Sequence, residues 1–257
     1  MVDISIIIPT LEPNPTFSWE EQLEASAVDG EVVLRDDPTA SEARNAGIRE
    51  ASADKLVFLD DDSDPQPGYF ERVSALLDDH PAVTGRIIDT GAQITRGLSG
   101  QYDQGDESHV TETVVGCNMA VRRSVLDDVG GFDPRLPYGH EEAELADRIS
   151  DAYYVWYDPE LVVAHPFADS LFDYFGKAYR HGREAIPYYL IRGENVHRRM
   201  LLHVLVPSHY IGDSPRATLF EATSQLASTA GLVRGYLKYA RGDRAATYTR
   251  GREAVES

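Results

Sequence analysis

The sequence predicts an α/β fold in which helices flank a doubly wound, mostly parallel sheet. Apolar, β-branched runs alternate with amphipathic stretches from the start of the chain, which is typical of parallel strands joined by crossover helices. The 257 residues, 42% of them hydrophobic, suffice for one sizeable domain with a small appendage. In such a sheet, ligands bind beyond the carboxyl ends of the strands.

Three short apolar runs predict the first strands. They are ISIIIP (4–9), EVVLR (31–35) and KLVFL (55–59). Helices are expected after each strand. Ser18 with Glu21, and Thr39 with Glu42, have the spacing of capping boxes, in which two side chains satisfy free N–H groups at a helix start. The third helix is expected over GYFERVSALLDD (68–79).

The pattern loosens in the polar, glycine-containing stretch 95–112, and long loops of this kind are often lids or binding segments. Strands are expected again at 113–121 and twice within 153–166, and the remainder of the chain has a helical pattern. We therefore expect one domain over residues 1–190, followed by a helical extension over residues 191–257 that packs on the domain or at an interface.

The composition is strongly acidic, with 43 Asp and Glu against 24 Lys and Arg and a net charge of −19. Such a charge disfavours binding to nucleic acid. Lysines are few, and the acidic excess runs along the chain instead of forming a tail. This favours a salt-adapted, haloarchaeal-like source, where salt screens the repulsion. An ordinary acidic protein is the alternative.

The expected location is the cytoplasm. No stretch approaches the ~18–20 consecutive apolar residues that a membrane span requires. The segment MVDISIIIPT lacks the basic region and the cleavage site of a secretory signal. Cys117 is the only cysteine, so no internal disulfide can form.

Aspartates cluster where the third predicted strand ends. Asp60, Asp61 and Asp62 are consecutive, and Asp64 follows one residue later. A solvated turn with N-capping aspartates explains one or two of them, but not three in a row at the end of a buried strand. An EF-hand-like calcium loop has a similar acidic spacing, but Pro65 stands where that loop needs glycine.

Two other interpretations of this cluster remain. Phosphatases of the haloacid-dehalogenase type also place D-x-D after an apolar strand, with the first aspartate as nucleophile. That motif normally follows a first strand, and no convincing downstream set of Thr or Ser, Lys and acidic residues is present. The second of these interpretations is a non-catalytic sugar-binding or calcium-binding module.

Five segments in order decide between these interpretations. Together they resemble family 2 glycosyltransferases with the GT-A fold, over roughly residues 3–185. The segments are SIIIPT (5–10), ARNAGIREASADKLVFLDDD (43–62), VGCNMAVRRSVLDDVGGFDPRL (115–136), HEEAELADRI (140–149) and YDPELVVAHP (157–166). The resemblance implies a metal-dependent, inverting transfer of a sugar from a nucleotide-sugar donor to a hydroxyl acceptor, for which a lipid-linked glycan at the inner face of the membrane is one candidate.

The resemblance also implies the roles of the acidic residues. Asp62, assisted by Asp60 and by His165, is expected to bind Mn²⁺ or Mg²⁺, since such ions prefer oxygen ligands and neutralise a leaving diphosphate. His165 is otherwise a capping or buried neutral histidine. Glu142 takes the position of the catalytic base, with Glu141 as the alternative. Both glutamates would otherwise merely favour the positive end of a helix.

The nucleotide-sugar contacts implied by the resemblance follow the strand ends. The expected residues are Pro9, Thr10, Leu11, Glu12, Asp36, Arg44, Asn45, Asp60, Asp61 and Asn118. A surface ion pair is the alternative for Arg44, and packing is expected for Cys117, which has no evident activating partner. The processive Q-x-x-R-W signature is absent, which favours the addition of single sugars. The oligomeric state stays open.

Overall fold

The computed structural model describes residues 2–12, 15, 17–96, 102–136, 138–206, 210–211 and 215–241. These residues form two compact units. The first consists of residues 1–133 and 141–167, and the second of residues 134–140 and 168–257. The boundary expected at residue 190 lies near the end of a long helix, whereas the two units divide before that helix begins.

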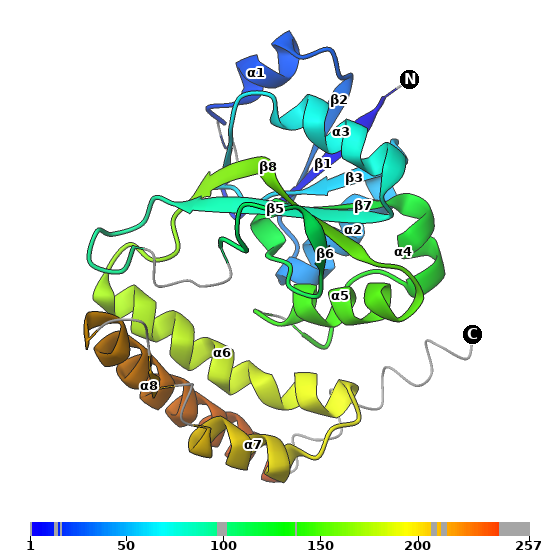
Figure 1. The fold of residues 1–257 in the computed structure, drawn as a ribbon. Helices are drawn as coiled ribbons and strands as arrows, with labels where there is room; N and C mark the ends of the chain where they lie inside the picture. The colour runs from blue at the N-terminus through cyan, green and yellow to red at the C-terminus, as the bar shows by residue number, and fades with distance from the viewer. Residues whose placement is uncertain are drawn as a thin grey trace. The chain divides into compact units, whose positions relative to one another are not determined.

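The first unit contains a mixed sheet whose strand order is β2-β1-β3-β7-β5-β8-β4, with β6 paired to β8 (Figure 1). Strands β1, β2, β3, β5 and β8 run in one direction and β4, β6 and β7 in the other. The strands are β1 (Ile4–Pro9), β2 (Gly30–Arg35), β3 (Lys55–Phe58), β4 (Asp64–Pro65), β5 (Ala82–Asp89), β6 (His109–Thr111), β7 (Met119–Arg122) and β8 (Val155–His165).

Helices cover both faces of this sheet, which confirms the predicted fold class (Figure 1). On one face, α1 and α3 pack on the strands, and on the other face α2, α4 and α5 do so. The helices are α1 (Glu20–Ala25), α2 (Ala40–Glu50), α3 (Tyr69–Asp79), α4 (Arg123–Val129) and α5 (Glu141–Ala152).

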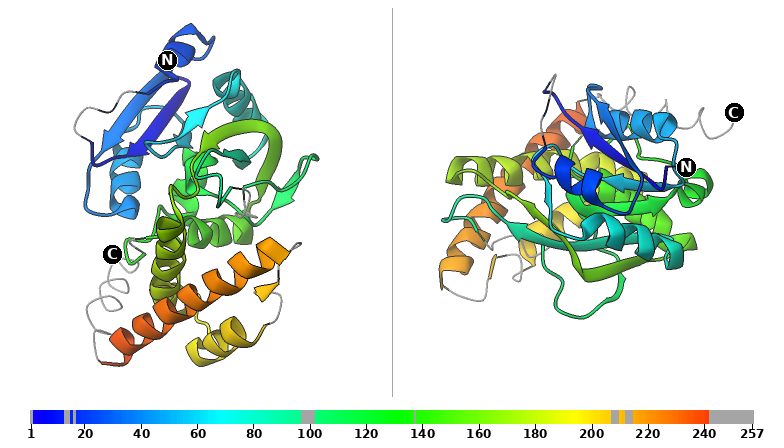
Figure 2. Two further views of the ribbon diagram at one scale, coloured as in Figure 1. Left: turned by 90° about the vertical axis from the view of Figure 1, so that its left-hand side faces the viewer. Right: turned by 90° about the horizontal axis from the view of Figure 1, so that it is seen from above.

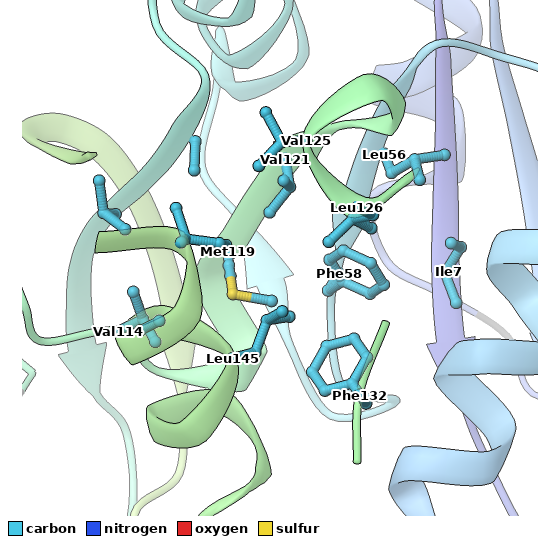
Figure 3. Close-up of a cluster of buried hydrophobic side chains, with 14 of the residues drawn as sticks. Ile7, Leu56, Phe58, Val114, Met119, Val121, Val125, Leu126, Phe132 and Leu145 are labelled. Carbon is cyan, nitrogen blue, oxygen red and sulfur yellow. The ribbon is translucent and has the colours of Figure 1, made fainter. Parts of the chain in front are cut away.

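The core on the α2, α4 and α5 face joins side chains from strands and helices (Figure 3). Phe58 of β3 meets Phe132 edge-to-face, with 5.2 Å between the ring centroids. Ile7, Met119 and Leu145 complete the cluster from β1, β7 and α5. Because Phe132 lies between α4 and α5, this packing fixes the chain just before the segment that leads into the acidic start of α5.

Three local predictions differ from the structure. Thr39 caps α2 as expected by accepting from the N–H of Glu42, but Ser18 does not cap α1, because its hydroxyl donates to the Asp64 carboxylate at 2.7 Å. The stretch 113–121 is a strand only from Met119, preceded by a 3₁₀ turn, η1 (Gly116–Asn118). The two strands expected within 153–166 are one long strand, β8.

The second unit is helical, with α6 (Leu171–Ile191), α7 (Val196–Leu205) and α8 (Pro215–Ala240). Helices α6 and α8 pack against each other, and in the left view of Figure 2 the two helices cross. Glycines allow this approach: a Cβ on Gly182 would collide with the carbonyl of Ser228, and one on Gly231 with the carbonyl of Tyr179. None of the described helices is both long and apolar enough to cross a membrane.

This close approach predicts a stability difference between two glycines of α6. Gly182→Ala should destabilise the protein by ~1–3 kcal/mol, because the added methyl meets backbone atoms that cannot move aside. Gly176→Ala is the matched control, since its Cβ would meet only the end of the Arg180 side chain, at 3.4 Å. Thermal and urea unfolding measure both variants. Equal stability of the two would contradict the packing described for α6 and α8.

Candidate active site

The sheet gathers the predicted site residues at one edge. The parallel strands β1, β3 and β8 end there, and the antiparallel β7 begins there, with Met119 paired to Phe58. The aspartates 60–62 follow β3 directly, and His165 is the last residue of β8. This topology brings segments that are about 100 residues apart in the sequence to one place, as expected for a ligand site in an open α/β sheet.

Arg44 of α2 links the aspartate cluster to the start of α5. Its Nη2 donates to Asp60 Oδ1 and its Nη1 to Glu141 Oε1, each at 3.0 Å. Burial alone would lower the pKa of Arg44, but the neighbouring carboxylates of Asp60 and Glu141 outweigh it and hold that pKa raised. The guanidinium also lies over the Phe132 ring, 5.4 Å from its centroid. Arg44 is therefore a buried, paired charge and not a surface ion pair.

His165 faces the aspartates with a defined orientation. Its Nε2 lies 2.9 Å from Asp62 Oδ1 and 3.8 Å from Asp60 Oδ2. Its Nδ1 is 2.8 Å from the hydroxyl of Tyr102, which fixes the ring. A histidine whose second nitrogen is held by a hydrogen bond is the usual arrangement for a metal ligand. Two carboxylates thus face this ring, and carboxylate oxygens are donors of the kind that Mn²⁺ and Mg²⁺ prefer.

A second set of ligand atoms overlaps this one. One ligand atom each from Asp60, Cys117 and His165 lies within 4.8 Å of the others, so these three residues also fit a metal ion. Cys117 lies in the turn η1 and is 1% exposed. Burial, and the nearby carboxylates of Asp60 and Asp62, raise the pKa of its thiol.

The loop after β1 is tied to the middle aspartate. Thr10 donates from its hydroxyl to Asp61 Oδ2 at 2.7 Å and accepts from the N–H of Glu12 at 3.0 Å. Leu11 is 88% exposed. Thr10 therefore joins this loop to the aspartate cluster, and the contact of Pro9, Thr10, Leu11 and Glu12 with a nucleotide sugar stays a prediction, while residues 13, 14 and 16 lie outside the described part.

The two glutamates at the start of α5 differ in environment. Glu141 is buried and receives the hydrogen bond from Arg44. In Glu142, Oε2 is buried and has no hydrogen-bond partner among the described residues. Burial, followed by repulsion from Glu141, raises the pKa of Glu142 to about 8. Since a catalytic base works best with a pKa near the operating pH, Glu142 has the properties of the base and Glu141 those of its neighbour.

Three of the residues expected to contact a nucleotide sugar have other surroundings. Asn118 is fully buried, and its amide bonds Tyr69, the carbonyl of Arg86 and that of Leu161, so we assign it a structural role instead. Asn45 exchanges two hydrogen bonds with the backbone of Phe132, at 2.7 and 2.9 Å. The third, Asp36, is exposed just after β2.

Two features of this site were not anticipated. The first is Tyr102, whose stretch of the sequence has no periodicity that would signal a contact with the last residue of β8. The second is the proximity of Cys117 to Asp60 and His165. The sequence does contain one signal for the latter: Cys117 lies two residues before the segment that pairs with β3, and Asp60 lies two residues after β3.

Comparisons with known proteins agree with this geometry. Residues 29–130 match the family model described as Glycosyl transferase family 2. The match begins just before β2, ends just after α4, and includes the aspartate cluster and Cys117. The resemblance found in the sequence is therefore supported by the family model over this part of the chain.

Named relatives belong to the same class. The chain is 26% identical to Glycosyltransferase AglE of Haloferax volcanii over 204 residues, which cover 73% of this chain and 66% of the relative. It is 25% identical to the Pre-mycofactocin glycosyltransferase of Mycobacterium tuberculosis over 163 residues, which cover 56% and 34%. The chain thus spans between about one third and two thirds of the length of these relatives. The salt-adapted source stays a prediction.

A solved structure of GalNAc-T7 with UDP, GalNAc and Mn²⁺ is similar at 12% identity, with a TM-score of 0.49, over 95% of this chain and 58% of that one. Among the three interpretations of the aspartate cluster, the family model and the named relatives favour the glycosyltransferase over the phosphatase and the binding module.

The buried carboxyl of Glu142 predicts a pH-dependent stability. Because its folded pKa of about 8 lies above the unfolded value of 4.5, the native state keeps a proton that the unfolded chain loses. Stability should therefore fall as the pH rises between these values. From about pH 5 to about pH 9, Glu142→Gln in metal-free protein should lose ~2 kcal/mol less stability than the wild type.

Urea unfolding at a series of pH values measures this difference. The exposed Glu24→Gln variant is the matched control, because it removes a carboxyl of the same type from the surface of α1. A pH dependence of Glu142→Gln equal to that of the wild type would mean that Glu142 is solvated, and it would remove the main reason to select Glu142 over Glu141.

Proposed function

We propose that the protein is a metal-dependent, inverting glycosyltransferase that uses a nucleotide-activated sugar. The observation that carries the proposal is the convergence, at one sheet edge, of two carboxylates and a histidine with a carboxyl that has a buried oxygen without a partner among the described residues. The ligating set is Asp60, Asp62 and His165, and the carboxyl is that of Glu142. The family model and the two named relatives support the same class.

Asp62 and Asp60 would hold the metal through carboxylate oxygens, and His165 would complete the set through Nε2. When bound, Mn²⁺ or Mg²⁺ supplies the positive charge that stabilises a leaving diphosphate. Tyr102 keeps the His165 ring in place, and Arg44 keeps one oxygen of Asp60 engaged so that the other faces the metal position. Arg44 relieves part of the repulsion among the three crowded carboxylates, and a bound cation would relieve more of it.

Glu142 would accept the proton of the acceptor hydroxyl as its oxygen attacks the anomeric carbon. The new C–O bond forms as the bond from that carbon to the diphosphate breaks, and the diphosphate leaves with the electron pair. One displacement of this kind inverts the anomeric configuration. The pKa of Glu142 makes it a stronger base than an exposed glutamate, and a cation bound nearby favours its charged form.

The donor's nucleotide would lie against the loop of Pro9, Thr10, Leu11 and Glu12, with Asp61 held by Thr10 at its border. This is the side on which β1 and β3 end next to each other. Asp36, which follows the neighbouring strand β2, stays a candidate contact to the donor. Arg44 would position Asp60 instead of contacting the donor, because its Nη atoms bond Asp60 and Glu141.

The acceptor is proposed to be a lipid-linked glycan, and a stripe on α8 supports a site at a membrane surface. Leu219, Leu226, Val233 and Leu237 follow each other at intervals of seven, seven and four residues, so they lie on one side of the helix. All four are exposed, and the first two are each 63% exposed. The neighbouring exposed positions carry basic residues, namely Arg216, Arg234, Lys238 and Arg241.

Acidic and basic residues are also distributed unevenly between the two parts of the chain. Of the 43 acidic residues, 34 lie in residues 1–167, whereas 13 of the 24 basic residues lie in residues 168–257. The acidic excess therefore does not run evenly along the chain, contrary to the expectation from the sequence. A basic helix with an apolar exposed face suits the surface of an anionic membrane. The cytoplasmic face of a membrane is the location that we propose.

The donor site is tested by thermal shift with nucleoside diphosphates, with and without Mn²⁺. The correct diphosphate at about 100 times its Kd should stabilise the folded protein by ~2.7 kcal/mol, and only when metal is present. Asp62→Asn should abolish this shift. Asp64→Asn is the matched control and should keep it, because Asp64 pairs with Ser18 outside the ligating set.

Three outcomes would count against the proposal. A diphosphate shift that is the same with and without metal would remove the metal from the donor site. Loss of metal binding in Asp64→Asn but not in Asp62→Asn would favour the calcium-loop interpretation of the cluster instead. Release of inorganic phosphate from phosphate esters, with no response to sugar nucleotides, would favour the phosphatase.

The α8 stripe is tested by sedimentation with vesicles. The protein should bind vesicles that contain phosphatidylglycerol more tightly than neutral ones, and binding should weaken as salt rises. The double variant Leu226→Gln, Val233→Gln should bind on the order of 100-fold or more weakly, because each apolar side chain contributes ~1.5–3 kcal/mol when it is fully inserted. Val110→Gln, at an exposed apolar position in β6, is the control. Binding unchanged by the double variant would disprove the role of the stripe.

A further inference from the structure

We propose that Cys117 is a further ligand of the metal site, so that Zn²⁺ or Co²⁺ binds through Asp60, Cys117 and His165. The inference shares Asp60 and His165 with the proposed function and rests on it for the identity of the site. It goes further because it assigns a thiol to a site otherwise built from oxygen and imidazole donors. It also predicts which ions the site prefers.

The geometry that carries the inference is the mutual distance of three donors. One ligand atom from each of the three residues lies within 4.8 Å of the other two. Zinc forms bonds of about 2.0 Å to imidazole nitrogen and carboxylate oxygen, and of about 2.3 Å to sulfur. Ligand atoms around one tetrahedral ion are therefore about 3.5 Å apart. Small side-chain rotations would close the remaining difference.

The backbone holds these donors in place. Cys117 lies in the turn η1, directly before β7, and Asn118 anchors this turn through hydrogen bonds to the carbonyls of Arg86 and Leu161. A Cβ on Gly116 would meet Arg44 Nη2 at 2.8 Å, so the turn lies against the guanidinium that holds Asp60. The three donors are thus attached to one rigid sheet edge, and binding needs little reorganisation.

The surroundings of the thiol are apolar on its other side. Cys117 packs in a small cluster with Ile87 and Tyr102, against which Val115 and Phe167 also lie. Tyr102 belongs to this cluster and at the same time bonds the His165 ring. Ion binding at this position is a simple exchange: the S–H bond breaks, the proton leaves to solvent, and the sulfur keeps the electron pair that it shares with the metal.

The thiol would make the site selective for softer metal ions. Mg²⁺ and Mn²⁺ prefer oxygen donors and gain little from sulfur, so they would use Asp60, Asp62 and His165. Zn²⁺ and Co²⁺ bind thiolate well and would draw in Cys117. Asp62, whose carboxylate lies 2.9 Å from His165 Nε2, or a water molecule would take a fourth position. Zn²⁺ should therefore displace Mn²⁺ from the site.

Cobalt titration of the full chain tests the proposal without an activity assay. A thiolate bound to Co²⁺ gives a charge-transfer absorption band in the near ultraviolet. Since Cys117 is the only cysteine of the chain, any such band must come from it. We expect one equivalent of Co²⁺ to produce the band in the wild type, and Zn²⁺ to abolish it by competition.

The matched variants are Cys117→Ser and Cys117→Ala. Both should lose the band and bind Zn²⁺ ~10-fold or more weakly, while Mn²⁺ affinity stays at the wild-type value. The alanine variant keeps the apolar packing around position 117, and thermal unfolding checks that each variant folds. Co²⁺ bound without a charge-transfer band, or Zn²⁺ bound equally well by folded wild type and Cys117→Ala, would overturn the proposal.

The result separates this inference from the proposed function. A cobalt band together with no Mn²⁺-dependent nucleotide shift would support thiol ligation and count against the transferase site. A Mn²⁺-dependent nucleotide shift with no cobalt band would keep the transferase site and disprove the thiol ligand.

Discussion

The ion pairs of Arg44 hold the candidate site together. One guanidinium, buried between α2 and the sheet, bonds Asp60 at the end of β3 and Glu141 at the start of α5. Removal of Arg44 would leave the Glu141 carboxylate buried without this ion pair, which costs several kcal/mol. The distance between the metal-ligating edge and the acidic helix start therefore depends on a single side chain. Its position in turn requires glycine at residue 116 and the ring of Phe132.

The reversal of one strand gives the site its composition. If β7 ran parallel to β3, its first residues would lie at the opposite edge of the sheet. Because it is antiparallel, the turn that carries Cys117 meets the residues that follow β3. The parallel pairing of β5 with β8 then brings His165 to the same edge. A mixed sheet can thus assemble a site from both strand ends and strand beginnings, whereas a purely parallel sheet uses only strand ends.

The sequence predicted the elements well where a pattern has a local cause. Apolar runs gave β1, β2 and β3, and the Thr39 cap gave the start of α2, since these depend on neighbours in the chain. The prediction from sequence failed where the hydrogen-bond partner of a residue is distant along the chain. Ser18 has the spacing of a cap, but Asp64 competes for its hydroxyl. Asn118 is a polar residue beside a functional strand end, yet its amide satisfies backbone carbonyls, which no local pattern reveals. Tyr102 was missed for the same reason.

The arrangement of charge is the reason why we propose a cation at this edge. Arg44 neutralises Asp60 and Glu141 in part, whereas Asp61 accepts a hydrogen bond from the neutral Thr10 hydroxyl, and Glu142 keeps a buried oxygen without a partner in the described residues. A buried carboxyl with no donor avoids the cost of its charge by holding a proton. A divalent ion held by the aspartates would favour the charged form of Glu142, so that metal binding and the basicity needed for transfer are coupled through the electrostatics of one small region.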